Sequence, residues 1–372
     1  MTWKFGRLPE NPQAWLMLAA KNRGIDVRRR RKTEDRLAPE LISMIGGGDG
    51  RRNASTRCLA HTKCKTNQLR MMYSCCQLNV PKASRTALVL KTLCGFSVRK
   101  IAQSLLLTEL GVQKRIERAK SQLRESEGWQ IASGKDELTR RTGAVHDVLY
   151  LLFNEGYHSS HDTLTVREDL CAEAIRLAFL LTEYEATRTP ASHALLALMC
   201  LHAARLKARM DTGSSVVLLA EQDRQLFDRR IIAQGMLPLA LAAEGDEPSS
   251  YHQEAAIAVE HCTAPSFEQT NWERIVTLYE HLYGLDPSPV VRLSYAIALG
   301  EWRGPESALD VLVKLEESPQ LANYPFFSIA YGEWLRRAGD KLQARSQFDR
   351  AKQLARNESA IRFIETRLAL CN

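Results

Sequence analysis

GFSVRKIAQSLLLTELGVQKRIERAKSQLRE, residues 95–125, has the layout of two short helices joined by a tight turn. Apolar residues recur at helical spacing in each half. They are Val98, Ile101, Ala102 and Leu105 in the first helix, and Val112, Ile116, Ala119 and Leu123 in the second. Thr108 suits the N-cap of the second helix, because its hydroxyl can accept a hydrogen bond from the first turn. The sequence therefore predicts a helix-turn-helix.

The second predicted helix carries a polar face opposite its apolar stripe, at about 100° of rotation per residue. The side chains on this face are Gln113, Lys114, Glu117, Arg118, Ser121 and Arg124. Cationic and hydrogen-bonding side chains on a rigid helix are what a recognition helix presents to the major groove of DNA. Arg115, at the edge of the stripe, fits a phosphate contact better than a base contact. The alternative interpretation is an ordinary charged surface in contact with solvent.

Charge is distributed unevenly along the 372 residues. Residues 1–130 contain 26 Lys and Arg against 10 Asp and Glu, a net charge of +16. Residues 131–372 contain 25 against 33, a net charge of −8. A cationic surface attracts polyanions by releasing their condensed counterions. We therefore expect the first part to face nucleic acid and the acidic part to face other partners.

Composition places the chain among globular proteins of two or three domains. Hydrophobic residues make up 45% and charged residues 25% of the sequence, which is typical of a soluble protein. No run approaches the roughly 18 apolar residues of a membrane span. The start, MTWKFGRLPENPQAW, lacks the apolar core of a signal peptide. We expect a cytoplasmic protein without a membrane partner.

Helical periodicity continues along nearly the whole chain and predicts an all-α fold. Beyond residue 138, helix pairs joined by Pro- or Gly-containing turns are typical of stacked helical hairpins. The expected core residues of these hairpins are Trp272, Leu278, Tyr279, Tyr295, Ala298, Trp334, Ala344, Phe348 and Ala351. The short run VVLL at 216–219 fits either an isolated strand or a buried loop.

Breaks in this periodicity divide the chain into five segments. They are a basic helical segment at 1–45, a flexible linker at 46–65, the helix-turn-helix domain at 66–127, a second linker at 128–137 and the helical-hairpin domain at 138–372.

The nine cysteines mostly lie within apolar helical patterns, which favours reduced, buried thiols over disulfides. Cys58, His61 and Cys64, with Cys75 and Cys76, offer ligands for a tetrahedral zinc ion. Their spacing matches no familiar zinc finger, so packed free thiols are the expected state.

A catalytic alternative rests on His146, Glu155 and His158, which lie close together in sequence. A helix end followed by a polar turn explains the stretch FNEGYHSSHD more simply. The chain contains no P-loop, nucleotide-binding fingerprint or nucleophile motif. We expect neither enzymatic activity nor a bound cofactor or metal.

ENPQAWLMLAAKNRGIDVRRRRK, residues 10–32, predicts a helix that runs into five consecutive cations. Asn11 can cap this helix and Pro12 can begin it. A cationic run alone is usually a solvated tail. Behind a helix anchored by Trp15, it can instead lie along a phosphate backbone.

These motifs together resemble those of the extracytoplasmic-function sigma factors of RNA polymerase. The pattern NPxAWL at 11–16, with NR at 22–23 and RRR at 28–30, resembles the end of their second region, and residues 66–125 resemble their fourth region. LYLLFNEGY at 149–157, DLCAEAIRL at 169–177 and EQDR at 221–224 resemble a subgroup with a tetratricopeptide-like C-terminal extension. The resemblance covers nearly the whole chain except residues 33–65.

The resemblance implies that the protein joins core RNA polymerase and binds promoter DNA. Gln113, Lys114, Glu117 and Arg118 fall where the family reads −35 bases, with Arg115 on the DNA backbone and Ser121 completing the same face. Asn22, Arg23, Arg28, Arg29 and Arg30 fall near the −10 element. The resemblance also implies that the extension takes over the regulatory task of a separate anti-sigma protein, and a protein partner is a further expectation for this helical domain.

The sequence departs from the family pattern in three places. Met1 falls midway through the second region, so we expect a truncated segment and weakened polymerase binding. The linker is basic and glycine-rich where relatives look acidic. Gly111 replaces a usual Thr in the recognition helix, at a cost of up to about 1 kcal/mol relative to Ala. Two further functions therefore stay open: a stand-alone helix-turn-helix regulator with a helical sensor or docking domain, and a truncated, inactive sigma factor.

Overall fold

The computed structural model describes residues 72–73, 75–77, 80–92, 95–104, 107–125, 135–157, 168–209, 217–245, 248–355 and 358–371. All regular elements of this part are helices, and no strand occurs in it, which confirms the all-α prediction. Within the same residues, no helix combines the length and apolar character needed to cross a membrane.

The described helices follow one another along the chain. They are α3 (Lys82–Thr92), α4 (Val98–Ser104), α5 (Glu109–Glu125), α6 (Lys135–Tyr157), α7 (Glu168–Glu183), α8 (Pro190–Ala203), α9 (Arg229–Ala242), α10 (Ser250–Thr263), α11 (Trp272–Leu285), α12 (Pro289–Arg303), α13 (Pro305–Leu315), α14 (Pro325–Arg337), α15 (Lys341–Leu354) and α16 (Glu358–Ala369). The 3-10 helices η1 (Leu206–Ala208), η2 (Leu219–Glu221) and η3 (Arg224–Leu226) lie between α8 and α9. In the described part of VVLL, Val217 and Leu218 have no regular structure and are half-buried, and Leu219 begins η2, so the strand interpretation is wrong there.

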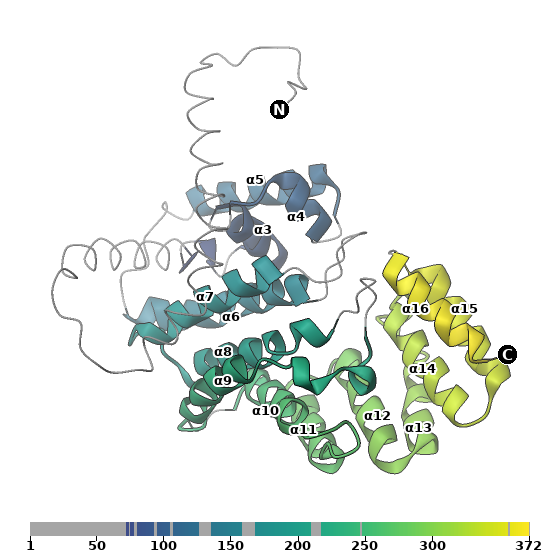
Figure 1. Cartoon of the computed structure of the whole chain (residues 1–372). Helices are drawn as coiled ribbons and strands as arrows, with labels where there is room; N and C mark the ends of the chain where they lie inside the picture. The colour runs from purple at the N-terminus through teal and green to yellow at the C-terminus, as the bar shows by residue number, and fades with distance from the viewer. Residues whose placement is uncertain are drawn as a thin grey trace.

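Figure 1 shows α3, α4 and α5 stacked on α6 and α7, with the later helices following in a curved row to the C-terminus. One apolar core runs through the first group, from Ile101 and Leu123 of the helix-turn-helix to Leu149 on α6 and Leu177 on α7. Its continuity fixes the helix-turn-helix against the rest of the molecule.

Polar contacts strengthen this attachment. The Tyr73 hydroxyl lies 2.8 Å from the Thr142 hydroxyl on α6, and Arg141 Nη1 donates to the Tyr73 carbonyl at 3.2 Å. Tyr73 is fully buried, and a buried hydroxyl without a partner would cost about 1–3 kcal/mol. The Thr142 contact removes that cost.

In the curved row, capping residues set the helix starts. The Ser288 hydroxyl accepts from the Val291 amide at 3.3 Å, and Pro289 occupies the first turn of α12. Gly304, with φ of 96°, separates α12 from α13 in a backbone conformation that favours glycine. The predicted Pro and Gly-Pro breaks are therefore confirmed.

Small residues stand where paired helices cross closely. A Cβ added at Gly300 on α12 would lie 2.5 Å from the Trp334 ring on α14 and 2.8 Å from Ala308 Cβ on α13. Phe348 of α15 is fully buried against Gly332 of α14. The aromatic and small residues predicted to form the hairpin core are buried or partly buried in one cluster.

Candidate nucleic-acid interface

Helix α5 begins at the predicted cap. The Thr108 hydroxyl accepts from the Gly111 amide at 3.0 Å, and the Thr108 carbonyl accepts from the Val112 amide at 3.0 Å. The predicted apolar stripe of α5, Val112, Ile116, Ala119 and Leu123, is buried against α3 and α4 or within their common core. The cap and the stripe together fix both the position and the rotation of the helix.

This rotation brings the predicted polar side chains to one exposed face. Gln113, Lys114, Glu117, Arg118 and Ser121 are exposed, and Arg115 is half-buried at the edge. In the described part of the chain, Lys114, Arg115 and Arg118 form no ion pair. Their charges are therefore available to an external anion.

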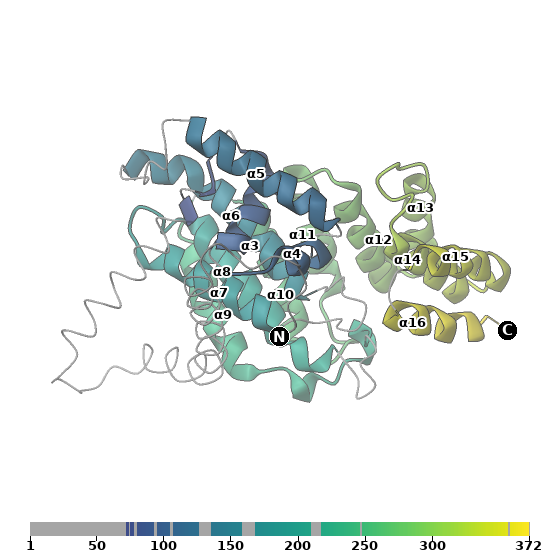
Figure 2. The ribbon, with the colours of Figure 1, turned by 90° about the horizontal axis from the view of Figure 1, so that it is seen from above.

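Helix α5 lies at the edge of the described helices. In Figures 1 and 2, α5 lies on the outer side of the helix-turn-helix, with the row from α12 to α16 at the other end.

Sequence reasoning missed three exposed side chains next to this face. Leu110, in the first turn of α5, is 60% exposed, and Lys120 of α5 and Arg99 of α4 are exposed as well. An apolar side chain at this place suits the methyl group of thymine, and the two cations suit phosphates. At 100° per residue, Leu110 lies about 160° from Val112 around the helix, which places it on the side opposite the apolar stripe. The prediction for this face named only polar residues and so did not include Leu110.

The second predicted set of DNA contacts, Asn22, Arg23, Arg28, Arg29 and Arg30, lies outside the described residues, as do Cys58, His61, Cys64 and His158. The side chain of Arg124 does so too. Cys75 and Cys76 are buried free thiols, as predicted. No group of three potential metal ligands occurs among the residues that the structure describes.

His146, the first residue of the catalytic alternative, is buried between α6 and α8. Its Nε2 atom lies 2.8 Å from the Ser192 hydroxyl, which donates to the Thr187 carbonyl at 2.7 Å. The serine proton is thus directed away from the imidazole, unlike in a nucleophile–base pair. Burial lowers the pKa of His146 to about 4, which keeps it neutral near pH 7. This arrangement suits a structural hydrogen bond.

The motif EQDR at 221–224 ties separate parts of the chain together. Gln222 accepts from Arg205 at 3.2 Å, and Asp223 caps η3 through the Gln225 amide at 2.8 Å. Arg224 Nη1 donates to the carbonyls of His261 and Ala264 at 2.7 and 2.9 Å, at the C-terminal end of α10. These last contacts neutralise the partial negative charge of that helix end.

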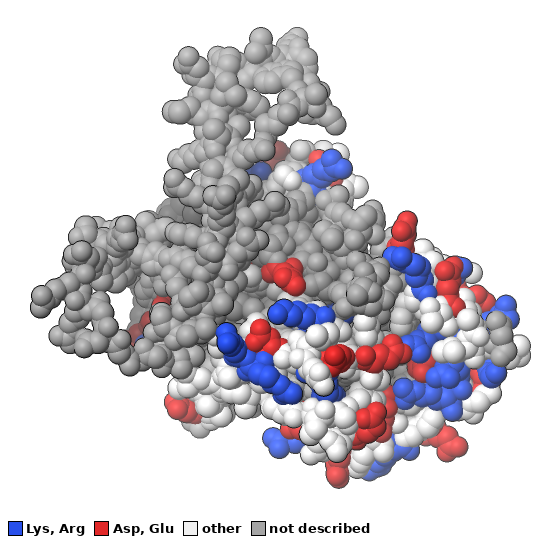
Figure 3. Space-filling model, viewed as in Figure 1, with Lys and Arg blue, Asp and Glu red and all other residues white. Residues whose placement is uncertain are grey.

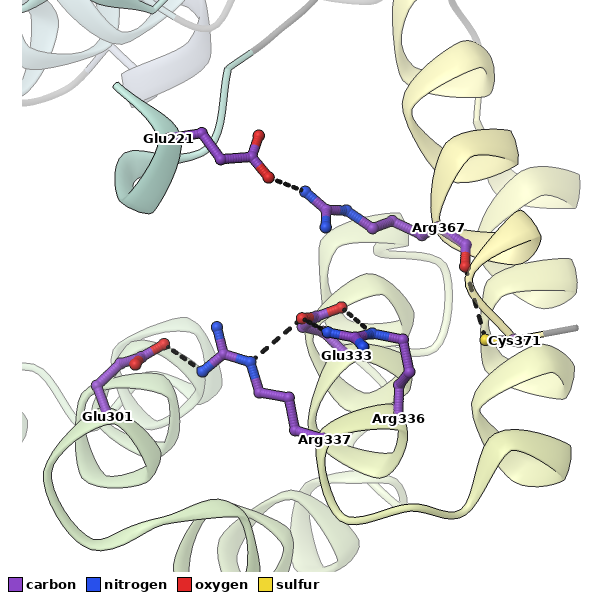
Figure 4. A network of polar contacts seen from close by, with 7 residues as sticks. All are labelled: Glu221, Glu301, Glu333, Arg336, Arg337, Arg367 and Cys371. Atoms are coloured by element: carbon purple, nitrogen blue, oxygen red, sulfur yellow. Dashed lines mark hydrogen bonds and ion pairs between the residues drawn. The ribbon is translucent and has the colours of Figure 1, made fainter. Parts of the chain in front are cut away.

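Glu221, the first residue of this motif, bridges η2 to the last helix. Its Oε1 atom lies 2.6 Å from Arg367 Nη2 on α16, and Figure 4 shows this pair beside a second network on α12 and α14. In that network, Arg337 joins Glu301 at 2.8 Å to Glu333 at 3.2 Å. Figure 3 shows cations and acids interspersed over this end of the molecule, which is the arrangement of a surface that satisfies its own charges.

Comparisons with known proteins place the chain in a family. An uncharacterized protein of Rhizobium meliloti (strain 1021) is 36% identical over 360 residues, which cover 97% of this chain and 84% of that protein. The chain belongs to the family of this rhizobial protein. Residues 141–243, from α6 to the residue after α9, match a family of unknown function (DUF6596). No solved structure matches the chain.

The matched segment contains some of the residues described above and leaves out others. It includes His146, Ser192 and the EQDR motif, whose partners on α10 and α16 lie outside it. Helix α5 precedes it, so the candidate DNA-binding face and the matched unit are adjacent parts of one chain.

Proposed function

We propose that this protein is a promoter-recognition factor of RNA polymerase, of the extracytoplasmic-function sigma class, and that it acts without catalysing a reaction itself. The observation that carries the proposal is the exposed face of α5, whose cations are unpaired within the described residues. Its location in a helix-turn-helix within the basic part of the chain supports the same conclusion.

In this proposal, α5 enters the major groove of the −35 element. Gln113, Lys114, Glu117 and Arg118 contact base edges, where Lys and Arg favour guanine and Gln favours adenine. Arg115, Ser121 and Lys120 contact phosphates and set the orientation of the helix. Asn22, Arg23 and residues 28–30 hold the −10 element, as the sequence resemblance implies.

The helices from α6 onward form the extension in this proposal, with a tetratricopeptide-like hairpin stack at its end. Its surface is acidic overall and its charges pair with one another, so it suits a protein partner better than DNA. Core RNA polymerase is one such partner, and a regulatory protein is another.

Transcription in vitro with core polymerase tests the proposal. The double substitution Lys114→Glu, Arg118→Glu is expected to abolish promoter-specific transcripts and to weaken promoter binding by about two orders of magnitude. Lys114 and Arg118 are exposed, so the fold should persist, as circular dichroism can verify. The matched control, Lys314→Glu with Arg362→Glu on α13 and α16, makes the same charge change far from α5 and should leave transcription intact. Unchanged output from the α5 variant would contradict the proposal.

A footprint made by the protein alone distinguishes the second candidate function. The exposed α5 face needs no rearrangement of the described helices to meet DNA, which favours a stand-alone regulator more than a buried face would. Protection of specific sites without polymerase, together with no promoter-dependent transcript, would support that regulator over the sigma factor.

A further inference from the structure

Helix α9 exposes a continuous apolar stripe. Its buried side packs on α8 through Ile232, Gly235 and Ala242. The exposed side, in chain order, is Arg229, Arg230, Ala233, Met236, Leu237, Ala240, Leu241 and Glu244. Leu237 is 59% exposed and Met236 is 40% exposed. Large apolar side chains gathered on one exposed helix face usually mark an interaction surface.

The order of residues along this stripe is self-complementary. Cations stand at its start, an acid stands just beyond its end, and small and large apolar residues are arranged symmetrically between them. When two copies of α9 lie antiparallel about a two-fold axis at Met236 and Leu237, Arg229 of each copy meets Glu244 of the other. Ala233 then meets Ala240, and Met236 meets Leu237.

We propose that the protein self-associates through α9, with a second copy of this chain as the occupant of the stripe. The inference is independent of the proposed function. Each contact occurs twice in an isologous interface, so one helix supplies two ion pairs and a central apolar cluster. The alanines let the helix axes approach to about 8 Å, where the larger side chains interdigitate.

Charge complementarity favours a second copy of this chain as the partner of α9. Arg229, Arg230 and Glu244 pair with no oppositely charged side chain within the described residues. Ala243 keeps helical backbone angles, so Glu244 stays in line with the stripe. From residue 229 to residue 244 the contact spans about 22 Å. One helix pair is a small interface, so we expect a dissociation constant on the order of micromolar.

Paired charge reversals test the proposal on the full chain. Arg229→Glu alone and Glu244→Arg alone each place like charges opposite one another at both ends of the interface. Each variant should weaken self-association about tenfold, as measured by sedimentation equilibrium, because two pairs change from attraction to repulsion. Mixing the two variants restores both attractive pairs, so a heterodimer should form with the affinity of the original protein.

Both reversals are compatible with the fold. An acid in the first turn of a helix and a cation beyond its end are favoured by the helix dipole, so neither variant should lose stability. Leu237→Lys should abolish self-association, whereas Leu342→Lys, at an 83% exposed position on α15, should leave it unchanged. A chain that stays monomeric at millimolar concentration would overturn the proposal. So would self-association that ignores the reversals, or a monomer whose Leu237→Lys variant loses core polymerase binding instead.

Discussion

Helices α5 and α14 both carry charged side chains on their accessible sides, but they use them in opposite ways. On α14, Glu333 accepts from Arg336 at 2.7 Å and from Arg337 at 3.2 Å, and Arg337 also pairs with Glu301 of α12. On α5, Lys114 and Arg118 extend from the surface without an ion-pair partner among the described residues.

This difference separates charge that holds the fold from charge that is available to a partner. A cation in an ion pair already interacts with a neighbouring carboxylate, so binding a phosphate would require breaking that pair. An unpaired cation binds the same phosphate with no such loss. The sign of a region's net charge is therefore a weaker guide to its partner than the state of its ion pairs.

Glu254 on α10 adds a third case to this comparison, a buried carboxyl. Its substitution is expected to have the largest effect on stability. Its Oε2 atom accepts from the Tyr150 hydroxyl of α6 at 2.6 Å, and burial raises the pKa of this carboxyl from 4.5 to about 7. Between these two values the folded protein keeps a proton that the unfolded chain has released, so stability falls as pH rises through this window.

The substitution Glu254→Gln removes this cost while keeping an oxygen for Tyr150. Urea denaturation should show no difference from the original protein below pH 4.5 and a gain of at most about 3 kcal/mol above pH 7. The control Glu280→Gln alters an exposed carboxylate that accepts from Tyr295 at 3.3 Å, and it should change stability little. Loss of stability in the Glu254 variant at pH 8 would show that the ionised carboxylate supports the fold.

Substitution of Gly300 tests whether the helical hairpins depend on close helix crossings. Helix α5, in contrast, is held by its stripe of apolar side chains. Gly300→Ala would place a methyl group 2.5 Å from the Trp334 ring and 2.8 Å from Ala308, and neither neighbour is flexible. We expect a loss of about 2 kcal/mol in the free energy of unfolding. Gly143→Ala, at an exposed position of α6 with nothing within 4 Å, should instead stabilise by about 0.5–1 kcal/mol. Equal effects at both sites would contradict the close crossing.

The parts of the fold that the sequence predicted are those encoded locally. The stripe from Val112 to Leu123 repeats at helical spacing, and Thr108 is a capping residue next to it, so α5 and its exposed face could be derived without coordinates. The same holds for the start of α12 at Pro289 and its end at Gly304.

Contacts between distant segments could not be derived in this way. Glu221 and Arg367 are 146 residues apart, and no local pattern pairs them. Helix α9 posed a different problem, since Ile232 and Leu237 are similarly apolar but only Ile232 is buried. Periodicity identifies a helix of this kind, but the packing of α8 decides which of its faces remains exposed.

Arg337 provides the test with the smallest expected effect, and it separates paired from unpaired charge directly. Arg337→Gln removes two ion pairs, whereas Arg303→Gln removes none among the described contacts. Each guanidinium lies over a tryptophan ring, at 4.6 Å for Trp334 and 4.0 Å for Trp302, so the two variants lose a similar cation–π contact. We expect Arg337→Gln to cost about 0.5–1 kcal/mol more than Arg303→Gln in urea denaturation, with the difference shrinking in high salt. Under the proposed function, promoter binding should be unchanged in both. A fall in DNA affinity for Arg337→Gln comparable to that of the α5 reversal would mean that paired charges also reach the DNA, and the distinction between the two helices would fail.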